Sequence, residues 1–115
     1  MDFNDRLISA ENLANALRRA GRPNQDAQAH LKDARRAEQI QTRLDAAQKT
    51  LDEALLVFHS VFSGRSSVED RERVDQRLNQ ARKQHAAVQV QLTKNGSFIS
   101  HLYESERLLK IRSAA

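Results

Sequence analysis

The chain contains no cysteine and no tryptophan, and among its 115 residues there are only one proline and three glycines. The absence of cysteine excludes disulfide bonds, thiol catalysis and cysteine-ligated metal sites. Because aromatic residues make up 4% and apolar residues 39%, we do not expect a thick globular core. Long helices that meet along narrow seams need less apolar material. The 30% of charged residues also fits long helices or a coiled coil.

Several sequence features of other protein classes are missing. No apolar run approaches the ~20 residues that cross a bilayer. The N-terminal stretch MDFNDRLISAENL carries acids early and lacks the apolar core of a secretory signal. We therefore expect a cytoplasmic protein. The glycines are isolated, so no phosphate-binding loop is formed, and neither a Ser–His–acid set nor a pair of catalytic carboxylates is recognisable. The sequence predicts no enzyme activity and no cofactor.

Apolar spacing predicts one all-α domain, residues 1–115, with three helical segments. The first spans about residues 2–20 and ends at Gly21, a typical C-cap, with Pro23 just beyond it. Asn24 is the predicted N-cap of a second segment, residues 25–62, roughly 57 Å long. The third, residues 67–113, begins at a capping box formed by Ser66 and Glu69. Whether Gly96 interrupts this third helix is left open.

The turns between the segments are short, and short turns join antiparallel helices. We therefore expect the second and third segments to form a long antiparallel hairpin with its tip at Gly64. The first segment should fold back beside the start of the second and the end of the third. This arrangement is a three-helix, coiled-coil-like bundle.

The hairpin tip carries more apolar surface than one neighbouring helix can cover. In the stretch ALLVFHSVF, residues 54–62, most of the apolar side chains spread over roughly 160° of the helix circumference, and Leu56 points nearly the opposite way. The facing stretch SVEDRERVDQRLNQARKQ offers only a narrow apolar stripe. Uncovered, the tip would expose on the order of several hundred Å², which is unusual for a monomer. We therefore expect self-association, as a dimer or tetramer, through Leu55, Leu56, Phe58, Val61 and Phe62.

Two other ways of covering the tip remain open. In one, the third helix kinks or the loop folds over the apolar residues. In the other, an amphipathic helix of a different protein binds there, as in an export chaperone. In the third segment, His85 occupies an apolar seam position between Ala81 and Val88. A polar residue in such a seam can fix helix register or oligomeric state. If two copies of the chain meet near His85, its protonation below about pH 6.5 would loosen their association.

A second candidate surface is basic. The net charge is +4, and the whole surplus lies after residue 57. The basic residues with the fewest acidic neighbours should form a collar at the base of the bundle: Arg18, Arg19, Arg22, Arg107, Lys110 and Arg112. Binding of nucleic acid by this basic collar is the main alternative function, although few aromatics are available to stack on single strands.

His30 lies in AHLKD, residues 29–33, a stretch similar to the H-x-L-K-G pattern of histidine phosphotransfer domains. The similarity is incomplete, because Lys32 comes one position too early and Asp33 stands near the site where a small glycine is needed. Asp26 and His30 are spaced i, i+4, but no Glu-x-x-His pair accompanies them, and we predict no metal site. The favoured interpretation is a non-enzymatic protein–protein interaction module of adaptor, chaperone, scaffold or inhibitor type.

Overall fold

The computed structural model describes residues 2–114, which form four α-helices and no strand. The helices are α1 (Phe3–Arg19), α2 (Gln25–Ser63), α3 (Val68–Asn95) and α4 (Phe98–Ala114). The predicted all-α fold is confirmed. The third predicted helix is interrupted at Gly96, which adopts a φ of +73° between α3 and α4. Over the described residues, no helix combines the length and the apolar character that a bilayer span requires.

Contacts within the chain divide it into two compact units. One unit joins the segment up to residue 39 with the segment from residue 95 onward, and we call it the base unit. The other, residues 40–94, is the hairpin unit. Helix α2 is continuous and contributes its first turns to the base unit and the rest to the hairpin unit.

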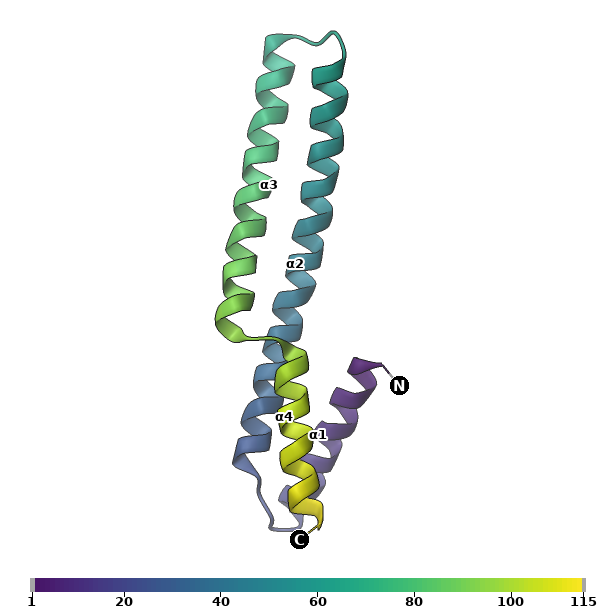
Figure 1. Ribbon diagram of the computed structural model, residues 1–115, viewed down its shortest axis with the longest axis vertical. Coiled ribbons are helices and arrows are strands. Elements are labelled where there is room, and N and C mark those ends of the chain that lie inside the picture. The colour runs from purple at the N-terminus through teal and green to yellow at the C-terminus, as the bar shows by residue number, and fades with distance from the viewer. Residues whose placement is uncertain (1, 115) are drawn as a thin grey trace. The chain divides into compact units, whose positions relative to one another are not determined.

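The base unit has the better-packed core. Three segments lie against one another in it, as Figure 1 shows: helix α1, helix α4 and the first turns of α2. Each contributes buried apolar side chains at helical spacing, namely Leu7, Ala10, Ala14, Ala27, Leu31, Ala34, Leu102 and Leu109. Small alanines on α1 and α2 allow these helices to approach closely, while the leucines fill the space between them. The predicted position of the first helix, beside the start of α2 and the end of the chain, is thus confirmed.

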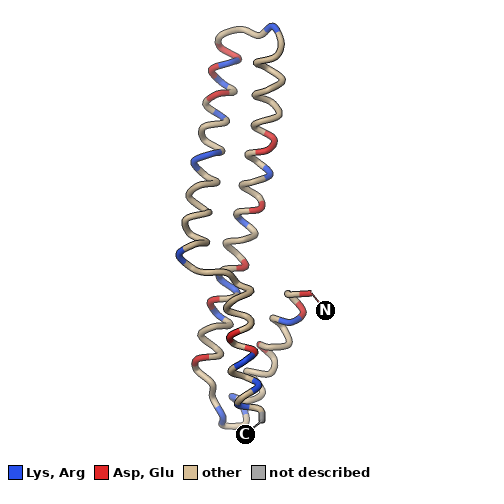
Figure 2. The backbone as a smooth tube through the Cα atoms, in the orientation of Figure 1, with Lys and Arg blue, Asp and Glu red and all other residues tan. Residues whose placement is uncertain are grey.

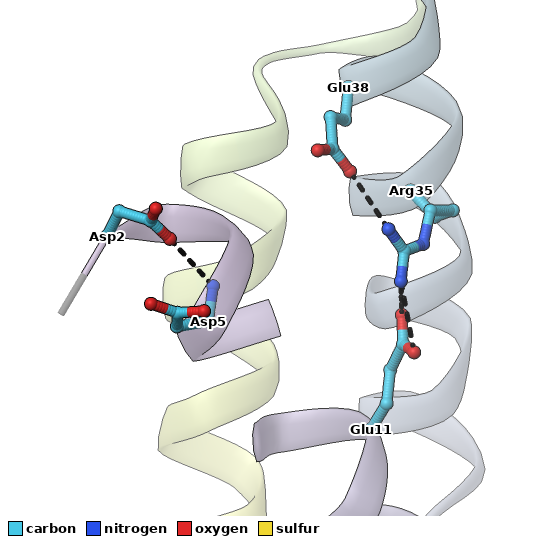
Figure 3. Close-up of polar contacts among 5 residues, drawn as sticks. All are labelled: Asp2, Asp5, Glu11, Arg35 and Glu38. Atoms are coloured by element: carbon cyan, nitrogen blue, oxygen red, sulfur yellow. Dashed lines mark hydrogen bonds and ion pairs between the residues drawn. The ribbon is translucent and has the colours of Figure 1, made fainter. Parts of the chain in front are cut away.

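Two ion pairs connect α1 to its neighbours. Arg6 on α1 donates two hydrogen bonds to the Glu106 carboxylate on α4, at 2.6 and 3.1 Å. These bonds, with a further one to the Tyr103 hydroxyl, raise the pKa of Arg6 above its ordinary value. Arg35 on α2 reaches Glu11 on α1 and Glu38 on its own helix, as Figure 3 shows. The pairs Arg6–Glu106 and Arg35–Glu11 thus join α1 to α4 and to α2 beside the apolar core.

The turn between α1 and α2 is built from local hydrogen bonds. The amides of Gly21 and Arg22 donate to the carbonyls of Arg18 and Leu17, which is the Schellman pattern that ends a helix. Gly21 has a φ of +75°, so a residue without a side chain is favoured there. Asn24 then caps α2: its Oδ1 accepts from the Ala27 amide at 3.0 Å. Both predicted caps are confirmed.

The hairpin unit is thinner. Helices α2 and α3 run side by side from residue 40 to 94, joined at the tip by the loop of residues 64–67 (Figure 1). Its buried cluster contains only Ala54, Leu78 and Ala81, against which Leu51, Leu55 and Phe58 pack while staying partly exposed. Leu44 and Ala47, which follow the same helical spacing as Leu51 and so lie on the seam side of α2, are also only half-buried. Two helices alone therefore leave much of this seam open to solvent.

The start of α3 differs by one residue from the predicted capping box. The Ser67 hydroxyl, not that of Ser66, accepts the hydrogen bond from the Asp70 amide, at 3.1 Å. The Ser66 hydroxyl instead donates to the Val61 carbonyl at the end of α2, at 2.8 Å. Both serines precede an acidic residue by three positions, so the spacing of a capping box alone does not choose between them. The hydroxyl of Ser66 is already bonded to α2, and Ser67 therefore caps α3.

Candidate functional site

The residues predicted to form the association surface lie in the last turns of α2, at the tip of the hairpin unit, and their exposure differs. Leu56 is 71% exposed and Phe62 42%. Leu55 and Phe58 pack partly onto the hairpin cluster, and Val61 is half-buried. Val68, at the start of α3, is 72% exposed and adds apolar surface next to the loop.

Contacts around Phe62 cover part of this tip. The rings of Phe58 and Phe62 stack with centroids 4.3 Å apart and planes 21° from parallel. The Arg71 guanidinium of α3 lies 5.4 Å from the Phe62 ring centroid, a cation–π distance. These contacts and the Ser66 bond to Val61 hold the loop against the end of α2. Leu56 receives none of this cover.

Charges of both signs lie on the α3 side of the apolar tip. Basic and acidic residues alternate along the first turns of α3 in Figure 2. The sequence there, VEDRERVDQR, interleaves acids with arginines. A surface that carries both signs can face a copy of itself without net repulsion, which a single-sign surface cannot. Further along α3, the predicted seam residue His85 is half-buried, as is Val88 one turn later.

The six basic residues of the predicted collar all belong to the base unit. Arg18, Arg19 and Arg22 are exposed around the turn after α1. Arg22 and Arg112 line one hollow together with Gly21 and Pro23. Lys110 lines a separate hollow between α1 and α4, whose other walls include Leu13 and Leu109. The structure therefore brings Arg22 and Arg112 together.

Arg107 is engaged by an acid. Its guanidinium donates to both carboxylate oxygens of Glu104, one turn earlier on α4. This hydrogen bonding lowers the pKa of Glu104 and raises that of Arg107. The ion pair offsets the charge of Arg107, so the basic collar is weaker at this position than the sequence alone indicates.

A cluster that the sequence does not reveal lies elsewhere in the base unit. His30 and Asp33, one turn apart on α2, meet His101 from the first turns of α4. Potential ligand atoms from the three side chains all lie within 4.8 Å of one another. The two imidazole centroids are 6.0 Å apart. Nδ1 of His30 is buried and has no hydrogen-bond partner among the described residues.

His101 is held in place by residues at the helix break between α3 and α4. Its Nε2 lies 2.8 Å from the carbonyl oxygen of Asn95. The ring packs so closely on Gly96 that a Cβ there would come within 2.8 Å of the same Nε2. Gly96 thus does two things: it takes a positive φ that ends α3, and it leaves space for the imidazole.

The sequence signal for this cluster is weak. Asp33 and His30 were visible on one helix face, but His101 comes from a helix far along the chain. Only the observation that a histidine follows Asn-Gly by a few residues could have directed attention to it. Phosphotransfer through His30 stays a prediction, and with Nδ1 buried it would have to use Nε2.

Comparison of the chain with known protein families, with the sequences of characterised proteins and with solved structures gives no match.

Proposed function

We propose that the protein is a non-enzymatic protein–protein interaction module that self-associates through the hairpin tip, in an adaptor, chaperone, scaffold or inhibitor role in the cytoplasm. The observation that carries the proposal is the exposure of Leu56, Phe62 and Val68 at the tip of a hairpin whose buried cluster is only three residues. Several large apolar residues exposed at one end of a hairpin are typical of an interaction site.

A second copy of the chain is the occupant that fits best. An isologous contact places the same surface on both sides, so the acids and arginines of one α3 can meet those of the other. Two paired hairpins also make a four-helix arrangement, which would cover the half-buried seam residues Leu44, Ala47 and Leu51. One contact would therefore bury both the tip and the open side of the seam.

The expected association is weak to moderate. Burying the exposed parts of Leu56, Phe62 and Val68 contributes roughly 3 kcal/mol per chain, or about 6 kcal/mol for a pair. Association costs roughly 4–15 kcal/mol. The gain of about 6 kcal/mol from the tip lies near the low end of that range, so burial of the seam has to supply the net stability. We expect a dimer whose population rises with protein concentration.

Sedimentation of the native chain and of Leu56→Glu tests where the copies meet. Leu56 is largely exposed, so the substitution leaves the fold intact while placing a charge in the contact. Val90→Glu, on α3 and also exposed, is the matched control. We expect Leu56→Glu to lower the average mass toward that of one chain and Val90→Glu to leave it unchanged. Equal masses for all three chains would contradict the proposed surface.

A second candidate function is binding of nucleic acid by a dimer through the basic collar, favoured by the shared hollow of Arg22 and Arg112. Contacts of this kind release counterions, so affinity falls steeply with salt. A fluorescent duplex probe would lose affinity in the double variant Arg22→Glu/Arg112→Glu. The control Arg107→Glu, at an arginine already paired with Glu104, should lose less. Absence of binding at low salt would exclude this function.

A further inference from the structure

The cluster of His30, Asp33 and His101 has the composition of a site for a late first-row divalent metal ion. Two imidazoles and one carboxylate are ligands that zinc takes in proteins. Hard ions such as Mg²⁺ and Ca²⁺ prefer sites made of oxygen ligands alone. The choice of side chains therefore indicates the class of ion before any geometry is considered.

The spacing of the ligand atoms is close to what such an ion needs. A tetrahedral zinc ion with bonds of about 2.0–2.1 Å holds its ligand atoms about 3.4 Å apart. In the structure all three lie within 4.8 Å of one another, so modest side-chain rotations would close the site. Asp33 is exposed at the surface of α2 and has room for such a rotation. His30 and Asp33 are spaced i, i+3 and so share a face of that helix.

The protonation of His101 fits the role of a ligand. The Asn95 carbonyl can only accept a hydrogen bond, so Nε2 of His101 carries the proton that it donates at 2.8 Å. In the neutral ring the lone pair is then on Nδ1. A hydrogen bond from the second ring nitrogen to a backbone carbonyl is the usual outer-shell support of a metal-bound histidine. Gly96 completes this support, because any Cβ would displace the ring.

His30 supplies the second independent observation. Its Nδ1 is removed from solvent and has no hydrogen-bond partner among residues 2–114, a costly state for a polar atom. Glu104, the carboxylate nearest in sequence to His101 on α4, is engaged by Arg107, which leaves Asp33 as the acidic member of the cluster.

We infer that His30, Asp33 and His101 bind one divalent metal ion of the zinc class, with solvent in the remaining coordination position. The ion would connect the middle of the base-unit segment of α2 to the first turns of α4. Because it binds the folded base unit and has no preformed site in the unfolded chain, it would stabilise that unit by mass action. This inference is independent of the proposed self-association, which concerns the hairpin unit.

Calorimetric titration of the metal-free chain with Zn²⁺, together with thermal unfolding followed by circular dichroism, tests the inference. We expect one Zn²⁺ per chain and a higher unfolding temperature in its presence. Co²⁺ should give the visible absorption of a tetrahedral site. His101→Ala and His30→Ala should each lose more than the roughly 10- to 100-fold in affinity that an outer-shell change costs. His59→Ala, an exposed histidine of the hairpin unit, is the matched control and should bind normally.

Asp33→Ala guards against variants that fail to fold, since Asp33 is exposed. We expect it to keep the native helical signal and to weaken Zn²⁺ binding by about 10-fold or more. Absence of saturable Zn²⁺ binding by the native chain would overturn the inference. So would affinities that are unchanged in both Asp33→Ala and His101→Ala, or a loss of binding in His59→Ala.

Discussion

Asn24 joins two helices of the base unit, and its removal should cost more than the removal of an ordinary N-cap. Its Oδ1 accepts from the Ala27 amide at the start of α2, and its Nδ2 donates to the Leu108 carbonyl of α4 at 3.2 Å. The residue is only 6% exposed. Asn24→Ala removes both bonds. We expect a loss of about 1 kcal/mol from the cap.

The bond to α4 adds a second contribution. Leu108 lies inside α4, so its carbonyl also accepts a hydrogen bond within the helix and is not left unpaired when the Asn24 side chain is removed. Only the net contribution of one hydrogen bond is then lost, about 1 kcal/mol. The free energy of unfolding should therefore fall by about 2 kcal/mol in Asn24→Ala. Asn24→Asp keeps the cap acceptor but replaces the donor to the Leu108 carbonyl with a second acceptor, so it tests the bond to α4 and should also be destabilising.

Urea denaturation followed by circular dichroism measures both variants. Asp2→Ala is the matched control, because the Asp2 carboxylate caps α1 of the same unit through the Asp5 amide at 2.8 Å and is exposed (Figure 3). It should cost no more than about 1 kcal/mol. If Asn24→Ala costs no more than Asp2→Ala, or if Asn24→Asp is neutral, the bond between Asn24 and α4 contributes nothing and the reasoning is wrong.

Two further predictions concern the base unit. Gly96→Ala and Gly21→Ala each force a side chain into a positive φ, at a cost of about 1–2 kcal/mol, but only the Cβ at position 96 would collide with His101. Urea denaturation should therefore show a larger loss in the free energy of unfolding for Gly96→Ala. Equal losses for the two variants would mean that the His101 ring moves aside freely. Arg107 lowers the pKa of Glu104, so the ion pair stabilises the fold fully at pH values above 4.5, the ordinary pKa of a glutamate. This contribution is lost as the pH falls through the lowered pKa. An NMR titration of the Glu104 carboxyl carbon should show a higher midpoint in Arg107→Gln, and an unchanged midpoint would contradict the pairing.

Local signals carried most of what the sequence predicts about the fold. Gly21 and Asn24 mark the turn after α1 through hydrogen bonds that reach only a few residues, and such bonds follow directly from residue type. The apolar spacing gave the helical class for the same reason. At the next turn the rule was satisfied by either Ser66 or Ser67, and the bond from Ser66 to α2 decided between them.

The interruption at Gly96 could not be decided from residue type alone. A glycine inside a helix costs only about 1 kcal/mol relative to alanine, so propensity permits either a continuous or a broken helix. In the structure the break is accompanied by the packing of His101 on the glycine and its bond to Asn95. Those contacts become visible only when α4 is placed in the base unit.

The candidate sites show the same limit. Apolar excess at the tip is a property of composition and periodicity, so the sequence alone predicts it on α2, where Leu56 and Phe62 are exposed. How much of it the chain covers depends on the stacking of Phe58 on Phe62 along α2 and on the contact of Arg71 with Phe62 across the hairpin. The cluster of His30, Asp33 and His101 depends on tertiary structure, because His30 and Asp33 lie on α2 whereas His101 lies on α4.

The solution mass of the native chain, measured by sedimentation over a range of concentrations at low salt and at about 0.5 M salt, tests the central claim most directly. Apolar association at the tip persists at high salt, where the Debye length is only a few Å and contacts between exposed charges are screened. We predict a mass that rises with concentration from one chain toward two, or toward four, in both buffers. A mass of one chain at every concentration and in both buffers would contradict self-association through the hairpin tip.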